Sequence, residues 1–125
     1  MPAVIALRIL FDHNVPIGVR DFLAGHEVHT ILEMHWPSQI ENGELLRAAE
    51  ASAFDVLLSS DQNIRYQQKL DGRRLALVVL GSNIWPIVRK HGKIIVAAVE
   101  RAEPGAYEFL EMPLPRRPPK DSARK

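Results

Sequence analysis

Cysteine is absent from this chain, which excludes disulfide bonds, thiolate catalysis and zinc sites built on cysteine. No apolar run approaches the roughly 20 residues that a membrane-spanning helix needs. The first residues also lack the basic stretch, apolar core and small-residue cleavage site of a secretion signal. We therefore expect a cytoplasmic protein with no membrane partner.

Several common binding motifs are missing as well. Neither GxGxxG nor GxxxxGKS/T occurs in the sequence, which argues against a nucleotide-binding α/β fold. No HExxH pair occurs among the five histidines. His26 and His29 are three apart on a predicted strand, so they point to opposite faces of it. The sequence thus predicts neither a phosphate-binding loop nor a zinc site.

The composition is that of one globular domain. A chain of 125 residues, with 46% hydrophobic and 25% charged residues, is long enough to bury a core. The net charge of +1 hides an asymmetry, because residues 113–125 carry +4 and residues 1–112 carry −3. We predict a folded domain over residues 1–112 and a disordered basic tail, rich in Pro, Arg and Lys, over residues 113–125. A contact between this tail and RNA phosphates or an acidic partner stays open.

Strand-forming and helix-forming segments alternate along the chain. Continuous apolar or β-branched runs predict strands at Val4–Phe11, His26–Leu32, Phe54–Ser59, Leu75–Leu80 and Ala106–Met112. Amphipathic spacing and end signals predict helices at Pro16–Leu23, at Gly43–Ser52 with Asn42 as N-cap, at Asn63–Leu70 and at Ile84–Ala102. This alternation predicts an α/β fold, a three-layer α/β/α sandwich around a mostly parallel sheet.

Three acidic residues stand at the ends of these predicted elements. Asp12 and Asp61 each follow a buried strand, and Glu44 opens the helix between them. Parallel strands bring their carboxyl ends to one edge of a sheet, where open α/β sheets bind ligands. Three converging acids repel one another unless a cation lies among them, so the pattern predicts an Mg²⁺ or Mn²⁺ site. Helix capping is the alternative account of each acid taken singly.

The segments FDHNVP, GHEVHT, ENGELLRAA and FDVLLSSDQN, in this order, resemble the PIN-like domain family over roughly residues 7 to 111. The resemblance is narrowest to small single-domain bacterial PIN-like proteins. It implies a PIN-like fold and an Mg²⁺- or Mn²⁺-dependent ribonuclease that cleaves RNA phosphodiesters with metal-activated water. It further implies the toxin of a toxin–antitoxin pair, with a small antitoxin protein as partner, and a homodimer. Carried over by position, Asp12, Glu44 and Asp61 match the metal-binding acids.

Asn63 departs from the family pattern, because many relatives carry a further aspartate at this position. An amide oxygen can ligate a metal but adds no negative charge, so we expect Asn63 to be a weaker metal ligand. This departure leaves open a catalytically weak PIN-like module that acts through a protein partner.

Three further residues are candidates for substrate binding. We expect Asn14 to contact the site, Arg65 to attract phosphate and Trp36 to stack on an unpaired base. A solvated helix face is an equal account of Arg65, and packing over the core or in a subunit contact is the alternative for Trp36.

A phosphate-receiver domain is a competing interpretation, because such domains also carry an aspartate after the third strand. It requires an acid cluster after the first strand and a lysine near the end of the fifth. This chain offers only Asp12 at the first place and no lysine between Lys93 and Lys120.

Overall fold

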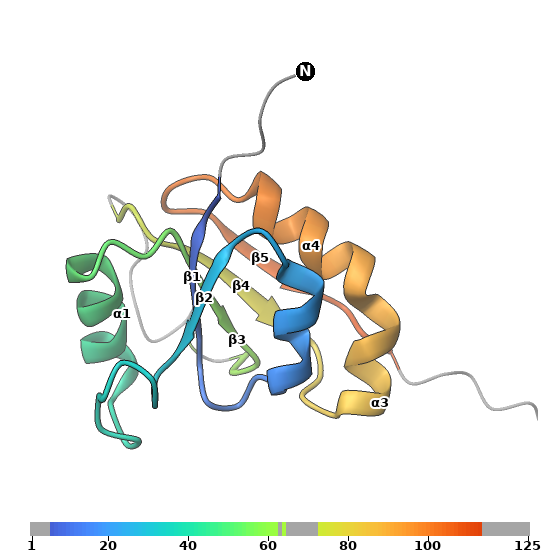
Figure 1. The fold of residues 1–125 in the computed structure, drawn as a ribbon, viewed down its shortest axis with the longest axis horizontal. Helices are drawn as coiled ribbons and strands as arrows, with labels where there is room; N and C mark the ends of the chain where they lie inside the picture. Colours follow the sequence, from blue (N-terminus) through green and yellow to red (C-terminus); the bar gives the residue numbers. More distant parts are fainter. Residues whose placement is uncertain (1–5, 63, 65–72, 114–125) are drawn as a thin grey trace, which may run out of the picture.

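A five-stranded parallel sheet forms the centre of the molecule (Figure 1). The computed structural model describes residues 6–62, 64 and 73–113. The strands lie in the order β2-β1-β3-β4-β5 and every neighbouring pair is parallel. Their bounds are β1 Arg8–Phe11, β2 Glu27–Thr30, β3 Val56–Ser59, β4 Ala76–Leu80 and β5 Tyr107–Leu110. The prediction of an α/β fold is confirmed, and the sheet is parallel throughout.

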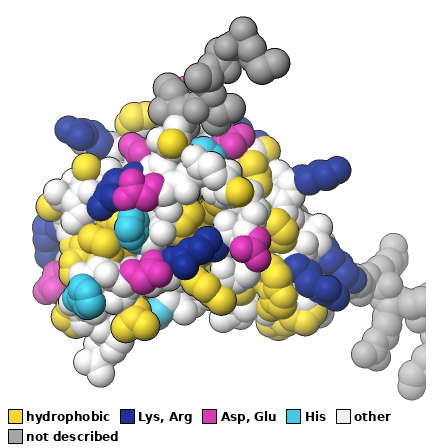
Figure 2. All heavy atoms as spheres, viewed as in Figure 1, with side chains coloured by type: hydrophobic (Ala, Val, Ile, Leu, Met, Phe, Trp, Pro, Cys, Tyr) yellow, Lys and Arg dark blue, Asp and Glu magenta, His cyan; other side chains and the backbone are white. Residues whose placement is uncertain are grey.

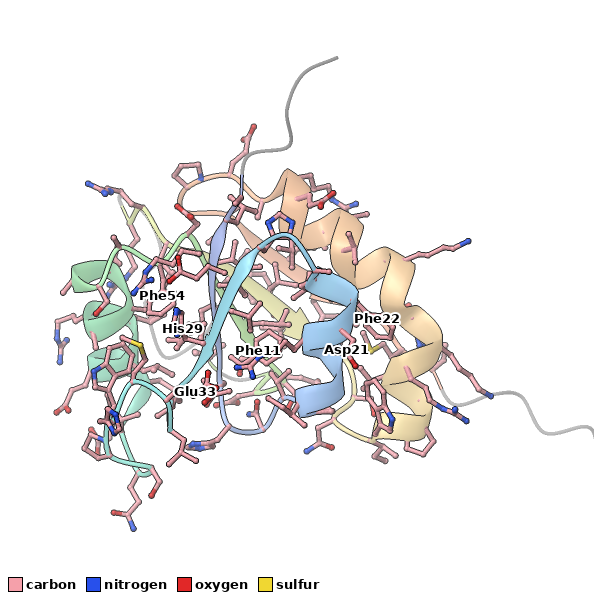
Figure 3. The ribbon with its side chains drawn as sticks, viewed as in Figure 1. Phe11, Asp21, Phe22, His29, Glu33 and Phe54 are labelled. Atoms are coloured by element: carbon pink, nitrogen blue, oxygen red, sulfur yellow. The ribbon has the colours of Figure 1, made fainter. Side chains whose placement is uncertain are left out.

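Helical segments cover both faces of this sheet. On one face lie the 3₁₀ helix η1 (Ile17–Leu23) and three consecutive segments, α3 (Trp85–Val88), η2 (Arg89–His91) and α4 (Gly92–Arg101). On the other lies α1 (Asn42–Ala51). Phe11 lies in the apolar cluster between the sheet and the layer of η1 and α4, and Phe54 lies in the cluster between the sheet and α1 (Figure 3). Every residue of β3 and β4 is buried, as continuous apolar strands require when both faces are covered.

The prediction of one continuous helix over residues 84–102 is wrong. The structure divides it into α3, η2 and α4, because the chain tightens into a 3₁₀ turn at residues 89–91. His91 Nδ1 lies 2.9 Å from the Ile87 carbonyl oxygen at this turn. The next residue, Gly92, approaches Phe22 of η1 so closely that a Cβ would lie 2.9 Å from the Phe22 ring. The break therefore lets α4 pack tightly against η1.

Other predicted elements differ in extent. The helix expected at residues 16–23 is a 3₁₀ helix, in which the Val19 N–H donates to the Pro16 carbonyl oxygen three residues back. The observed strands are shorter than the apolar runs that predicted them. The expected helix at residues 63–70, except Ile64, and the tail beyond Pro113 lie outside the described residues. Within the described part of the chain, no helix has the length and apolar character needed to cross a membrane.

Glu50 joins α1 to the segment that enters β4. Its carboxylate accepts hydrogen bonds from the Arg73 guanidinium and from the Arg74 backbone N–H, the latter at 2.9 Å. Burial acts to raise the pKa of Glu50, but these two donors outweigh it and hold that pKa below the ordinary value of 4.5. Because the folded pKa lies below the unfolded one, ionised Glu50 stabilises the fold above pH 4.5. This contribution is lost as the pH falls through the folded pKa.

Replacing Glu50 with glutamine should therefore destabilise the protein in a pH-dependent way. We expect the free energy of unfolding to fall by about 1–2 kcal/mol at pH 7, since two charge-assisted hydrogen bonds at a partly exposed site are weakened. The difference from wild type should shrink as the pH falls below 4.5 and approaches the lowered pKa of folded Glu50. Urea unfolding across this pH range measures it, with the exposed Glu103→Gln as control. A difference that does not vary with pH would contradict the assignment.

Candidate functional site

The candidate site lies at the carboxyl ends of β1 and β3. The chain passes from β1 to β2 on one side and then crosses to β3 on the other, so the strand order reverses between β1 and β3. Ligands of open α/β sheets bind in the crevice outside such a reversal. Asp12 follows β1 directly, and its backbone N–H donates to the Leu58 carbonyl oxygen of β3 at 2.9 Å. The sheet thus places this residue at the reversal point.

Asp12 is a buried acid, with 5% of its surface exposed. Its Oδ2 accepts a hydrogen bond from the Ser59 hydroxyl, and its Oδ1 accepts one from the His13 backbone N–H, both at 2.9 Å. Among the described residues no lysine or arginine lies within 4.0 Å of it, and His13 Nε2 is 3.9 Å away. A buried carboxylate with so little positive charge near it is costly unless a cation binds it.

Ser59 connects Asp12 to Asp61. This fully buried serine donates its hydroxyl hydrogen to Asp12, and its Oγ accepts the Asp61 backbone N–H at 3.0 Å. The last residue of β3 therefore fixes both the rotamer of one acid and the backbone of the other. From the sequence alone, Ser59 is only the last residue of a predicted strand. The signal in the sequence was a hydroxyl group at the end of an otherwise apolar, buried strand, because a buried hydroxyl needs a hydrogen-bond partner.

Asn42 holds Asp61 from the side of α1. Its Nδ2 donates to Asp61 Oδ2 at 3.1 Å. The prediction that Asn42 is the N-cap of this helix is wrong: Asn42 is the first helical residue, and Glu41 is the N-cap, with no cap hydrogen bond from its side chain. The Asn42 amide instead bonds the acid that follows β3. The beginning of α1 is thereby brought to the same edge of the sheet as Asp61.

Glu44 lies on the first turn of α1, two residues after Asn42, and its side chain is exposed. The Glu44 carboxylate makes no hydrogen bond or ion pair with a described residue, whereas Asp12 and Asp61 are linked through Ser59. Within residues 6–62, 64 and 73–113, no group of three or more His, Asp or Glu side chains is close enough to hold a metal ion. The structure thus joins two of the three predicted acids and leaves the third on the nearby helix.

The predicted substrate-binding residues differ in their placement. Asn14 connects the two loops of the site, because its Oδ1 accepts the Ser60 backbone N–H at 3.0 Å. Trp36 packs edge-to-face on Phe54, with ring centroids 6.4 Å apart, and also lines a cavity beside His13. Asn63 and Arg65 lie outside the described residues. Asn14 therefore has a structural partner already, and Trp36 both packs on the core and faces a cavity.

Replacing Ser59 with alanine should destabilise the fold, because it leaves Asp12 Oδ2 buried without its donor. We expect the free energy of unfolding to fall by about 1.5–3 kcal/mol, the usual range for a hydrogen bond to a charged group. Ser60→Ala is the matched control, since the one hydrogen bond that the Ser60 hydroxyl makes within the described part of the chain is long, 3.4 Å to the Asn14 carbonyl oxygen. Urea unfolding measures both variants. Equal losses in the two would contradict the role given to Ser59.

Comparison with known proteins gives no relatives: no family model matches this chain, and no curated protein or solved structure is significantly similar to it.

Proposed function

We propose that this chain is a PIN-like ribonuclease that depends on Mg²⁺ or Mn²⁺, with a three-layer α/β/α fold and a cytoplasmic location. The observation that carries the proposal is the buried carboxylate of Asp12, which has no lysine or arginine beside it among the described residues. It is joined through Ser59 to Asp61, where the strand order reverses. Buried charges in proteins are paired or coordinate metals, so a cation accounts for this acid.

The donor set suits a hard divalent cation. Mg²⁺ prefers oxygen ligands and keeps several waters, so one or two carboxylates together with substrate phosphates are enough to bind it. Asp12 and Asp61 are the two acids that Ser59 links, through the carboxylate of Asp12 and the backbone N–H of Asp61. Glu44, on the first turn of the neighbouring helix, and Asn63 are proposed as the further ligands. This set contains no cysteine or histidine, which favours Mg²⁺ or Mn²⁺ over zinc.

The proposed chemistry is hydrolysis of an RNA phosphodiester. A bound Mg²⁺ or Mn²⁺ supplies positive charge beside the scissile phosphate and lowers the pKa of a water molecule. The chain itself orients the acids: Ser59 holds the Asp12 carboxylate, and Asn42 holds that of Asp61. Because these hydrogen bonds are present before substrate binds, little reorganisation is needed. No serine, cysteine or histidine nucleophile is required.

Incubation of the purified protein with a mixed, structured RNA pool in Mg²⁺, Mn²⁺ or EDTA tests the proposal. We expect cleavage in either metal and none in EDTA. The protein must be folded and free of any bound antitoxin, because a bound inhibitor mimics an inactive enzyme. A folded, partner-free protein that leaves RNA intact in both metals would refute the nuclease.

A PIN-like module that binds without cutting is the second candidate. One observation favours it, since the described residues contain no group of three or more possible metal ligands. Such a module would act through a small antitoxin protein or as a homodimer, the two partners that the family resemblance suggests. Light scattering at micromolar concentration tests the homodimer, and a monomer there would contradict it. Retained RNA or antitoxin binding by a folded protein that never cleaves would favour this second candidate.

The strand order also suits a phosphate-receiver domain, which shares it. Such a domain needs a lysine at the end of the fifth strand. β5 ends at Leu110 and is followed by Glu111. Labelling of Asp61 by acetyl phosphate is the result that would revive this alternative.

A further inference from the structure

A cavity of about 530 Å³ opens beside the candidate site. It is lined by His13, Ile31, Leu32, Trp36 and Ser38, and its volume is within the range of roughly 300–1,000 Å³ typical of small-molecule sites. His13 is both a wall of this cavity and the residue whose backbone N–H bonds Asp12. The cavity and the acidic edge are therefore neighbours. We infer that the cavity binds an unpaired base of single-stranded RNA, an inference that rests on the proposed ribonuclease function.

The loop after β2 holds Trp36 firmly at this place. The Trp36 backbone N–H donates to the Ile31 carbonyl oxygen at 3.3 Å, and the turn between them places His35 at a φ of 61°. Such a left-handed conformation is uncommon outside glycine and marks a tight turn. Phe54 packs edge-to-face against the indole, with ring centroids 6.4 Å apart (Phe54 is labelled in Figure 3). A tryptophan held in this way loses little conformational freedom when a ligand stacks on it.

The lining suits a flat, uncharged ring. Ile31, Leu32 and Trp36 give an apolar surface, and Leu32 is 82% exposed. The Ser38 hydroxyl and the His13 imidazole are the polar groups available to the edge of a base. Among the described residues, no carboxylate, ammonium or guanidinium group lines the cavity. The phosphates would then lie toward Asp12 and Asp61 and the base in the neutral cavity.

A single-stranded substrate follows from this arrangement. Bases in a duplex are stacked and paired, and turning one outward costs a few kilocalories per mole, which an unpaired base avoids. Figure 2 shows acidic, basic and histidine side chains interspersed over the viewed face, with no broad basic surface there to grip a duplex backbone. Stacking on an aromatic side chain is the usual way in which proteins bind unpaired bases. The cavity thus favours single-stranded over double-stranded RNA.

Tryptophan fluorescence tests the inference directly. The chain has two tryptophans, and Trp85 stacks on Phe22 in the helical layer on the other face of the sheet. In a Trp85→Phe variant, Trp36 is the only tryptophan left. We expect a single-stranded RNA hexamer to quench its fluorescence saturably in EDTA, where metal-dependent cleavage cannot occur. The same hexamer paired with its complement should need at least a tenfold higher concentration.

A binding measurement completes the test. Anisotropy of the labelled hexamer in EDTA should show roughly 5- to 150-fold weaker binding by Trp36→Leu, a variant that keeps apolar packing on Phe54. Trp85→Leu is the matched control and should bind within twofold of wild type. Unchanged fluorescence at saturation, or unchanged affinity in a folded Trp36→Leu, would overturn the inference, as would equal binding of the duplex. RNA that binds at Trp36 but is never cleaved in metal would support the cavity while refuting the nuclease.

Discussion

Replacing Asp61 with asparagine should abolish metal-dependent RNA cleavage, lowering its rate at least about 100-fold. The charge of this acid is what the proposed cation binds, and metal stabilisation of the reacting phosphate is worth several kilocalories per mole. Asparagine has nearly the same shape, and its amide oxygen can still accept the hydrogen bond that Asn42 donates to Asp61 Oδ2. The substitution therefore removes charge while keeping the packing of α1 against the sheet. Gel analysis of RNA products in Mn²⁺ measures the loss.

The matched control is Asp21→Asn, which neutralises an exposed aspartate on η1, away from the carboxyl ends of the strands. It should cleave RNA at the wild-type rate. Circular dichroism and urea unfolding of all three proteins establish that each is folded before rates are compared. Full activity in a folded Asp61→Asn protein would remove Asp61 from the site. Equal losses in both variants would point to a general charge effect instead.

The central strands were the most predictable part of the fold. Runs such as Val56–Ser59 and Ala76–Leu80 are apolar at every position except the serine, and the structure buries all of them. Such continuous apolar runs are typical of strands in a parallel sheet that is covered on both faces. The position of Asp12 and Asp61 at one edge followed from the same reasoning, because parallel strands share their direction. The sheet therefore places both residues at the predicted edge.

The breaks in the helical layer were not predictable from periodicity. The apolar positions of residues 84–102 follow one helical spacing, yet the chain tightens at residues 89–91 so that Gly92 can approach Phe22. This contact joins residues 70 positions apart in the sequence, so the local spacing of apolar residues cannot predict it. The Asn42 side chain is a similar case. A good N-cap residue by type, it bonds Asp61 from another loop, because a tertiary partner outweighed the local preference.

The hydrogen-bonded core of the site was also hidden from sequence reasoning. Ser59 belongs to a strand, so its hydroxyl attracted no functional role until its contacts with Asp12 and with the Asp61 backbone were visible. Glu44 is the opposite case, because the sequence pattern assigned it a role in the site for which the structure shows no hydrogen bond with Asp12 or Asp61. Its place at the start of a helix was predicted correctly, but the direction of an exposed side chain depends on what it contacts. The sequence therefore predicts which residues lie at the carboxyl edge of the sheet better than it predicts which of their side chains contact one another.

Mn²⁺ should stabilise the wild-type protein strongly and the Asp12→Asn protein hardly at all. A cation that binds only the folded state adds about 2.7 kcal/mol to the free energy of unfolding at 100 times its Kd. For a chain of this length that corresponds to a rise in Tm of roughly 10 °C. Asp12 dominates the effect because its carboxylate is buried, so the cation offsets a charge that is poorly solvated by water. Asparagine carries no such charge, and its Tm should rise by less than about 2 °C.

The shift in Tm between EDTA and Mn²⁺, rather than the Tm itself, is the readout, because the asparagine amide also changes the hydrogen bonds to Ser59 and His13 in the apo protein. Differential scanning calorimetry measures both states of each protein. Asp21→Asn should keep the whole wild-type shift, since this exposed residue lies on η1. A wild-type shift that survives in Asp12→Asn would place the cation elsewhere. No shift in wild type at millimolar Mn²⁺ would mean that Asp12 is buried without a metal, and the binding-only module would then be the better account of the fold.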